Sequence, residues 1–321
     1  MTTSMRTAVL SGPRRIELRT APRPEAGPSE VLVALHGCGV CGSNLPVWEG
    51  RPWFEYPLPA GAPGHEAWGR IEAVGDGVTS LQLGQSVAVL SDFAFAEAAA
   101  VPAGAVVGLP AALDGQPFPG EALGCAFNVA ARSDFAAGQT VAVVGAGFLG
   151  AVVVALAAQA GARVIAISRR PYALEVARSM GAVETVRMDD RDRVIDRVRH
   201  LTDGRWCERV VEAVGAQEPL DLAGELTAER GRLIVAGFHQ DGPRTVDLQL
   251  WNWRGIDVVN AHERDRSVAL AGIRSAVGAV ASGRLDPSPL YTHQYPLDRL
   301  GDAMDAMVQR AEGFLKAMVS T

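Results

Sequence analysis

The sequence predicts an α/β fold in which a doubly wound parallel sheet is joined to a second, β-rich domain. Strand and helix patterns alternate regularly in the middle of the chain, from about residue 127 to 260. A glycine-rich turn, Gly145-x-Gly147-x-x-Gly150, follows the first apolar strand pattern of that region. Residues 6–110 differ, because short β-rich runs alternate there with proline- and glycine-rich turns. Alternation indicates a parallel sheet covered on both faces, whereas closely spaced short strands indicate a compact, mostly antiparallel domain.

The expected elements follow from these patterns. The middle region has predicted strands at 141–145, 163–167, 184–186, 209–214, 232–236 and 256–260, and helices at 148–160, 172–180, 191–202 and 218–228. The β-rich region has predicted strands at 31–35, 69–74 and 86–90, and the C-terminal region has helices at about 268–282 and 298–310 and a strand at 314–319. We expect this last strand to return to the first domain, which would then comprise residues 1–121 and 262–321, with 122–261 as the dinucleotide-binding domain.

The glycine-rich turn predicts a dinucleotide site. Gly145 allows a tight turn after the strand, Gly147 lets the backbone approach a pyrophosphate, and Gly150 lets the following helix pack on the sheet. The helix N-terminus adds N–H groups and a partial positive charge. An ordinary strand–helix turn is one alternative. A membrane span is another, since residues 135–162 carry no charge, but the glycine spacing and the next strand pattern argue against it.

Composition excludes several classes of function. The 321 residues are 48% hydrophobic and 21% charged, and the net charge of −6 leaves no basic surface for nucleic acid. The N-terminal residues lack the apolar core of a signal peptide, so we expect a cytoplasmic protein without a membrane partner. Four scattered cysteines are too few for a disulfide framework and are expected to be free thiols or metal ligands.

Two short motifs in the β-rich region offer metal ligands. One contains Cys38-x-x-Cys41 and continues into Gly42-Ser43-Asn44, and the other is Gly64-His65-Glu66. Thiolate, imidazole and carboxylate are the donors that Zn²⁺ prefers, and a catalytic zinc site uses three protein ligands and one open position. A structural zinc knuckle is the alternative, although no second cysteine pair lies nearby to complete it.

These motifs together resemble zinc-dependent medium-chain dehydrogenases, and within them the polyol and sorbitol dehydrogenase branch, over nearly the whole chain. The resemblance implies a Rossmann domain and a discontinuous GroES-like catalytic domain. It also implies hydride transfer between an alcohol, or the matching ketone, and a nicotinamide cofactor. The strand at 256–260 would pair across a two-fold axis, so a homodimer or homotetramer is expected.

The resemblance also implies a ligand set. Cys41 and His65 would be two zinc ligands, and Glu121, 24 positions before Gly145, would be the third. Cys125 is the alternative third ligand, because it follows Glu121 by one helical turn. Ser43 would take the substrate proton, and Glu66 would exchange with water at the metal or support the site. The cofactor would contact the glycine-rich turn together with Phe148, Leu149, Val214 and Gly237.

Three departures from the family pattern stand out. No cysteine occurs in residues 89–96, where a four-cysteine lobe for a structural zinc would begin, so one catalytic zinc and no structural zinc is expected. Asn44 replaces an aspartate that would hold a ligating histidine more strongly. Pro46 replaces the histidine of the proton relay, so the relay would end on water or on another group.

The choice of cofactor depends on the end of the second strand of the parallel sheet. A carboxylate there selects NAD by accepting from the ribose 2′-hydroxyl, but this chain has Ser168-Arg169-Arg170. A hydroxyl and two guanidinium groups would bind a 2′-phosphate, which favours NADP(H). The alternative is that the arginines face solvent and the site accepts both cofactors.

Two other functions remain open. The first is a zinc-free NADPH-dependent reductase of quinones or enones on the same scaffold, and the second is an NADP(H)-binding sensor that has lost catalysis. The aromatic residues Trp48, Trp53, Phe54 and Tyr56 would line a substrate pocket or pack in the core. The remaining histidines are expected to be hydrogen-bonded or exposed, namely His36, His200, His239, His262 and His293.

Overall fold

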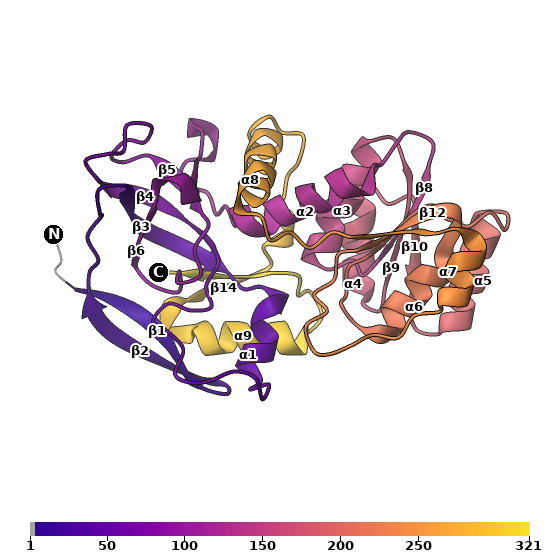
Figure 1. Ribbon diagram of the computed structural model, residues 1–321, viewed down its shortest axis with the longest axis horizontal. Helices are drawn as coiled ribbons and strands as arrows, with labels where there is room; N and C mark the ends of the chain where they lie inside the picture. The colour runs from indigo at the N-terminus through magenta and orange to yellow at the C-terminus, as the bar shows by residue number, and fades with distance from the viewer. Residues whose placement is uncertain (1–3) are drawn as a thin grey trace. The chain divides into compact units, whose positions relative to one another are not determined.

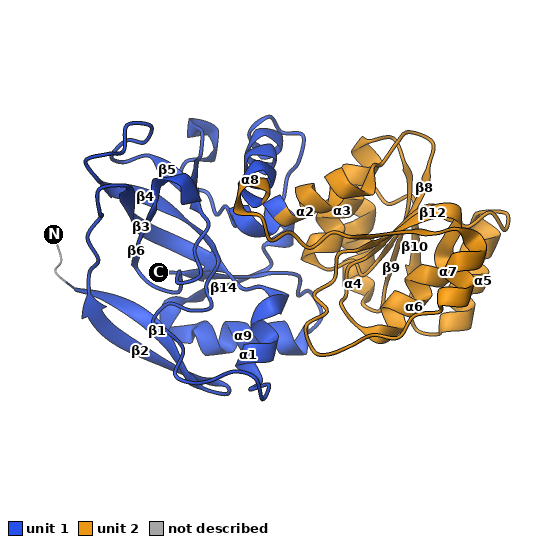
Figure 2. Ribbon diagram, in the orientation of Figure 1, with its two compact units in different colours: residues 1–124, 269–321 blue, residues 125–268 orange. Residues whose placement is uncertain are grey.

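The computed structural model describes residues 4–321, which form two compact units (Figure 2). Unit 1 contains the described residues up to Gly124 together with Ala269–Thr321, and unit 2 contains Cys125–Val268. Each unit has a hydrophobic core of its own. The division makes unit 1 discontinuous in sequence, since its C-terminal part follows the whole of unit 2.

Unit 1 is built on a seven-stranded, mainly antiparallel sheet (Figure 1). Its strands run in the order β14-β15-β3-β4-β5-β7, and β6 also pairs with β3. They are β3 (Glu30–Gly39), β4 (Glu66–Val74), β5 (Ser86–Val89), β6 (Ala98–Pro102), β7 (Val106–Gly108), β14 (His293–Pro296) and β15 (Ala317–Ser320). A separate hairpin joins β1 (Ser4–Gly12) to β2 (Arg15–Pro22). Unit 1 also contains the helices α1 (Leu45–Trp48) and α9 (Leu300–Gln309) and most of α8 (Arg266–Ala281), whose first residues belong to unit 2.

The C-terminal strand joins this sheet between β14 and β3. β15 pairs antiparallel with β3, with Met318 opposite Gly39, as the expected return of the chain to the β-rich region requires. On its other side β3 pairs with β4, and Gly39 lies opposite Glu66. The end of β3 is therefore flanked by the start of β4 and the start of β15, and this is where the candidate ligands lie.

Unit 2 is a six-stranded parallel sheet in the order β10-β9-β8-β11-β12-β13. The strands are β8 (Thr140–Val144), β9 (Arg163–Ser168), β10 (Glu184–Arg187), β11 (Cys207–Glu212), β12 (Thr227–Val235) and β13 (Asp257–Asn260). The helices are α3 (Phe148–Gln159), α4 (Pro171–Ser179), α5 (Arg191–Leu201), α6 (Gln217–Leu226) and α7 (Leu248–Arg254), and α2 (Gly120–Ser133) leads into the unit. The order reverses between β8 and β11, which is the switch point where doubly wound sheets bind their ligands.

Burial explains the composition of the central elements. Val141 to Val144 are fully buried, because helices cover both faces of the sheet: α3 packs with α4, and α6 packs with α5 and α7 (Figure 1). α3 is apolar all round, as expected for a helix enclosed by its neighbours. The uncharged stretch that suggested a membrane span is thus an interior strand and helix. In the described part of the chain, no helix is both long and apolar enough to cross a membrane.

The structure differs from the sequence-based expectation at several elements, two of them in unit 2. β12 begins at Thr227, where a helix was expected to continue to residue 228. Helix α7 was not predicted, because it has only seven residues and none of them is buried. Its N-cap was a usable signal, since the Asp247 side chain accepts a hydrogen bond from the N–H of Leu250.

Candidate functional site

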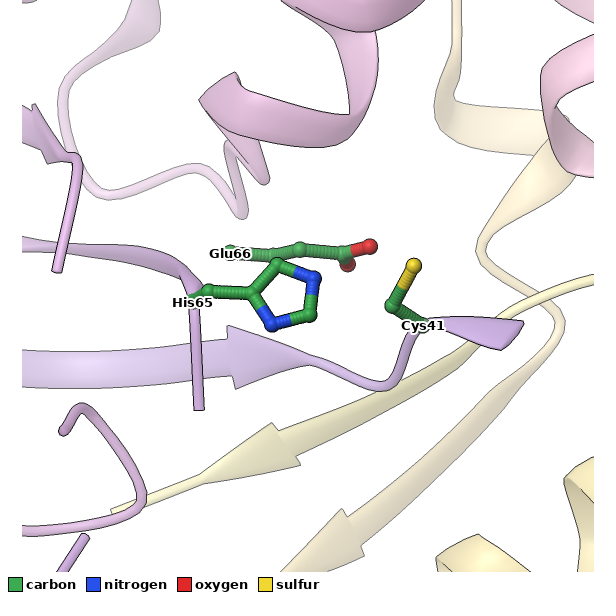
Figure 3. A group of neighbouring side chains, drawn as sticks. All are labelled: Cys41, His65 and Glu66. Carbon is green, nitrogen blue, oxygen red and sulfur yellow. The ribbon is translucent and has the colours of Figure 1, made fainter. Parts of the chain in front are cut away.

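Cys41, His65 and Glu66 come together at the end of β3 and the start of β4. One ligand atom from each lies within 4.8 Å of the ligand atoms of the other two. The thiol, the imidazole ring and the carboxylate point toward one another (Figure 3). Cys41 and His65 are partly exposed and Glu66 is fully buried, so the group has a closed side and an accessible side.

The geometry fixes which histidine nitrogen is available for a ligand. His65 Nδ1 lies 2.9 Å from the carbonyl oxygen of Pro63, and a carbonyl can only accept a hydrogen bond. Nδ1 therefore carries a proton. His65 Nε2 is the nitrogen that faces the other candidate groups, and a metal ion would bind there.

Asn44 has a different role from the one expected. Its Oδ1 accepts from the backbone N–H of Cys41 at 2.9 Å, and its Nδ2 donates to the Pro63 carbonyl at 3.1 Å. That carbonyl is the one that accepts from His65. The fully buried amide therefore links the Cys41 turn to the acceptor of His65 instead of holding the imidazole directly, and a carboxylate could not make the bond to Pro63.

Glu121 and Ser43 approach the same imidazole nitrogen. Glu121, in the first turn of α2, places Oε2 4.0 Å from His65 Nε2, and Ser43 Oγ lies 3.5 Å from it. Both side chains of the Glu121–His65 pair are about one-fifth exposed, at 21% and 18%. Cys125, one helical turn after Glu121, belongs to unit 2.

Glu66 is held by Lys316, which is the only lysine of the chain. Lys316 Nζ donates to Glu66 Oε1 at 2.6 Å, and both side chains are buried. They meet across β3 at Gly39, where a Cβ atom would lie 1.9 Å from Glu66 Oε2. Burial lowers the pKa of Lys316, but Glu66, Cys41 and Glu121 together outweigh it and raise the pKa overall. The sequence does not predict this pair, because no local pattern indicates a contact between residues 250 positions apart.

The acidic groups around His65 raise the pKa of its imidazole. Burial lowers the pKa of His65, but its hydrogen bond with Cys41 and the charges of Cys41, Glu121 and Glu66 raise that pKa to about 10. Without a metal ion, the site therefore retains a proton on Nε2 at neutral pH. A divalent cation would replace that proton, and the thiolate, imidazole and carboxylate donors present here are those that zinc prefers.

The residues between the two motifs favour core packing over a pocket. Trp48 is buried in the unit 1 core and donates its Nε1–H to Asp305 at 2.9 Å, while Phe54 and Tyr56 pack against that core. Trp53 differs, with an exposed fraction of 52%.

The glycines of the turn after β8 have distinct structural reasons. Gly145 has a φ of +103°, and a Cβ on Gly150 would lie 1.9 Å from the Gly145 carbonyl oxygen. A Cβ on Gly147 would meet only Nη2 of Arg170, at 4.0 Å. Packing thus explains Gly145 and Gly150 but not Gly147. Gly147 is the N-cap residue of α3, next to Phe148 and Leu149, and the absence of a closer neighbour is compatible with the predicted approach of a pyrophosphate.

The end of β9 places three predicted cofactor residues beside this turn. Ser168 is the last residue of the strand and is buried, Arg169 is exposed, and Arg170 is the N-cap of α4. The proximity of Arg170 to Gly147 shows that its guanidinium group extends toward the glycine-rich turn.

Val214 and Gly237 lie in the turns after β11 and β12. Sequence reasoning missed the residue that organises them, Glu212, whose buried carboxylate accepts from the N–H groups of Val214 and Gly215 at 2.7 and 2.8 Å. A carboxylate at the end of a strand, two residues before Val214, was the available signal.

Taken together, a doubly wound dinucleotide unit and a β-rich unit with a cysteine–histidine–carboxylate cluster define a dehydrogenase of the zinc type. The sequence matches the family model described as an alcohol dehydrogenase GroES-like domain over residues 27–111. It matches the model described as a zinc-binding dehydrogenase over residues 149–270. The chain belongs to the zinc-type medium-chain dehydrogenase/reductase family and is an oxidoreductase.

Individual relatives agree with this assignment. An alcohol dehydrogenase of Cupriavidus necator is 28% identical, and the alignment covers 99% of each chain. The sorbitol dehydrogenase of Bacillus subtilis is 26% identical, with 98% of this chain and 97% of the relative covered. Among solved structures, an alcohol dehydrogenase from Thermus sp. ATN1 superposes with a TM-score of 0.83 at 26% identity, covering 98% of this chain and 99% of the other.

Proposed function

We propose that this protein transfers hydride between NADP(H) and a hydroxyl group of a polyol, sugar or cyclitol, or the matching ketone, at a single catalytic zinc ion. The observation that carries the proposal is the cluster of Cys41 and His65 with Glu66 in unit 1, to which Glu121 adds a second carboxylate, its Oε2 4.0 Å from the available nitrogen of His65. Thiolate, imidazole and carboxylate are the donor types that a catalytic zinc site uses.

Cys41, His65 and Glu121 would hold the ion. Glu66 is the other carboxylate in reach, but its buried ion pair with Lys316 keeps it engaged, so we assign it a supporting role. When bound, zinc supplies Lewis-acid polarisation of the substrate oxygen. Asn44 fixes the backbone of the Cys41 turn, and the Pro63 carbonyl keeps His65 Nδ1 protonated and Nε2 oriented toward the ion.

Ser43 would take the proton of the substrate hydroxyl. Its Oγ is partly exposed and lies 3.5 Å from His65 Nε2, on the accessible side of the ligand cluster. Pro46 cannot continue a proton relay from this serine, because its side chain has no group that ionises. We therefore expect the proton to leave through water.

NADP(H) is favoured by charge. No carboxylate follows β9, and Arg170 reaches toward Gly147 from the N-cap of α4. A 2′-phosphate placed at this strand end would meet Ser168, Arg169 and Arg170, and charge-assisted hydrogen bonds from guanidinium groups would stabilise it. The nicotinamide supplies the hydride chemistry, and the chain supplies position and charge.

The proposed substrate class rests on relatives. One of the chains to which this sequence is similar over nearly its full length is a sorbitol dehydrogenase, whose name denotes a polyol substrate. Glutamate as the third zinc ligand, instead of cysteine, is also the pattern of the polyol branch that the sequence resembles.

We also propose a homo-oligomer, a dimer or a tetramer, in which β13 pairs with its copy. β13 is the last strand of the parallel sheet, and its residues Asp257, Val258 and Asn260 are exposed. Large apolar side chains near it are exposed as well, including Leu248 at 67% and Trp253 at 87%. An open strand edge bordered by apolar surface suits pairing with a second copy.

The test combines a substrate panel with one variant. Purified protein is assayed with NADP⁺ and NAD⁺ against polyols, sugars and cyclitols, and separately with NADPH against quinones and enones, before and after zinc chelation. We expect alcohol oxidation with NADP⁺ that chelation abolishes. Ser43→Ala should lose most turnover while still binding zinc and NADPH. Quinone reduction that survives chelation would favour the zinc-free reductase instead, and cofactor binding without any turnover would favour the sensor.

A further inference from the structure

A buried carboxylate organises the turn that follows β11 in unit 2. Glu212, the last residue of the strand, is fully buried. Its Oε1 accepts from the N–H groups of Val214 and Gly215 at 2.7 and 2.8 Å, and its Oε2 accepts from His239 Nε2 at 2.8 Å. One side chain therefore fixes the turn after β11 and connects it to the segment that follows β12.

The turns after β11 and β12 also fit closely against each other. The N–H of Gly237 donates to the backbone carbonyl of Glu212 at 2.8 Å. A Cβ atom on Gly237 would lie 2.2 Å from the nitrogen of Gly215 and 2.5 Å from Glu212 Oε2. Gly215 has a φ of +84°, a conformation that favours glycine. Any shift of one turn therefore displaces the other.

Arg244 determines which ring nitrogen of His239 accepts and which donates in this network. Arg244 Nε lies 3.0 Å from His239 Nδ1, and Nη2 of the same arginine donates to the Gly215 carbonyl at 3.1 Å. A guanidinium group can only donate, so His239 Nδ1 accepts and Nε2 carries the proton that is donated to Glu212. Arg244 thus donates a hydrogen bond to His239, and His239 donates one to Glu212. Arg244 also forms an ion pair with Asp241.

The network follows β11 and β12, in the half of the parallel sheet that does not contain the glycine-rich turn. The strand order consists of two halves, β8 to β10 and β11 to β13, and in doubly wound dinucleotide folds each half receives one mononucleotide. The β8–β10 half carries the glycine-rich turn and Ser168-Arg169-Arg170, which suit the pyrophosphate and the adenosine ribose. The carboxyl ends of β11 and β12 therefore remain for the nicotinamide half.

The chemistry of the Val214 turn agrees with that division. Because Glu212 already accepts from the N–H groups of Val214 and Gly215, this turn has no pair of free donors to offer a phosphate. The turn after β8 differs, since it opens onto a helix N-terminus with no side-chain cap. A rigid turn with satisfied donors and a partly exposed Val214 suits contact with a flat ring and a ribose.

We infer that Glu212, His239 and Arg244 are positioning residues that lock the Val214 and Gly237 turns in the shape that receives the nicotinamide half of the cofactor. This inference rests on the proposed dinucleotide function. Its specific content is that the network acts on one half of the cofactor and leaves the adenosine half unaffected.

The test measures two ligands on the same variants. NADP⁺ reports on the whole cofactor, and 2′,5′-ADP reports on the adenosine half alone; both are titrated calorimetrically against wild type and His239→Ala. We expect His239→Ala to weaken NADP⁺ binding by about tenfold or more, because Glu212 loses a buried donor, while 2′,5′-ADP binding is essentially unchanged. His239→Gln should recover much of the lost affinity, since an amide can both donate to Glu212 and accept from Arg244.

Controls separate a positional effect from a general one. His200→Ala removes an exposed histidine of unit 2 outside the network and should change neither affinity. Arg244→Met removes the donors to His239 and Gly215 without emptying the buried position, and serves if His239→Ala does not fold. Thermal unfolding establishes that each variant is folded before titration.

The results distinguish a failure of this inference from a failure of the proposed function. Equal losses for NADP⁺ and 2′,5′-ADP, or no loss for either, would overturn the inference while leaving the proposed function intact. A wild-type protein that binds NAD⁺ and 5′-ADP instead would correct only the cofactor preference, and the same comparison would then be made with that pair. A wild type that binds no dinucleotide would overturn the proposed function itself.

Discussion

The ion pair of Lys316 and Glu66 joins residues that are 250 positions apart and buries both charges beside the ligand cluster. Such a pair is weak evidence for net stabilisation, but removing one partner leaves the other charge buried and uncompensated. Gly39 makes the arrangement possible, because any side chain there would occupy the position of the Glu66 carboxylate. Three residues on three adjacent strand segments therefore depend on one another.

Replacing the lysine tests this dependence. Lys316→Met should lower the free energy of unfolding of the zinc-free protein by about 3–5 kcal/mol, because Glu66 would keep its buried position without a partner. Lys316→Arg should cost less, since the positive charge remains. The measurement is chemical denaturation of wild type and variants at neutral pH.

An exposed pair provides the control for the lysine substitution. Arg299 and Asp302 form an ion pair with side chains 61% and 55% exposed, and exposed pairs contribute at most about 1 kcal/mol. Arg299→Met should therefore have little effect. A Lys316→Met variant no less stable than Arg299→Met would mean that Glu66 does not depend on the charge of Lys316.

At the scale of the element, the turn from β8 into α3 contains glycines with two different roles, packing at Gly150 and the proposed approach of the cofactor at Gly147. Gly150→Ala places a Cβ 1.9 Å from a backbone oxygen, so α3 must move away from the sheet. Gly147→Ala meets nothing closer than 4.0 Å within the protein. We expect Gly150→Ala to lower both the melting temperature and NADP⁺ affinity, and Gly147→Ala to lower only the affinity, because its methyl group occupies the space of the pyrophosphate.

Thermal unfolding and NADP⁺ titration of the two variants check this expectation. If Gly147→Ala binds NADP⁺ as wild type does, the pyrophosphate does not approach the backbone at Gly147, and the proposed pyrophosphate site is wrong.

The same elements show how much of the fold the sequence predicts. The strand patterns near 141–145 and 163–167 correspond to β8 and β9, because buried parallel strands are continuous apolar runs that can be recognised locally. Helix α7 has seven residues and none of them is buried, so it is too short to show a helical period clearly. The Cys41 and His65 motifs lie on adjacent segments, so their meeting could be expected. The pairs Lys316–Glu66 and Glu212–His239 depend on tertiary packing, which spacing does not reveal.

At the scale of the whole molecule, the open edge of the parallel sheet predicts self-association. Val258, on β13, is 45% exposed, and a lysine there would place a charge in the proposed contact between copies. Val258→Lys should shift the protein to the mass of one chain, 33.8 kDa, from a multiple of it in wild type.

Light scattering after size-exclusion chromatography measures the change. Val183→Lys is the matched control, because Val183 is 59% exposed beside β10, the opposite edge of the same sheet. A wild type that already elutes as a single chain would contradict the proposed pairing, as would equal dissociation by both variants.

The zinc content of the purified, dialysed protein tests the central claim most directly. Wild type should contain about one zinc ion per chain, because the proposed ligands Cys41, His65 and Glu121 would supply three donors and no four-cysteine lobe is present in the sequence. Glu121→Ala should lose the metal, whereas Cys125→Ala should retain it. Wild-type protein that holds no zinc yet oxidises or reduces its substrate would contradict the account and identify a zinc-free reductase on this scaffold.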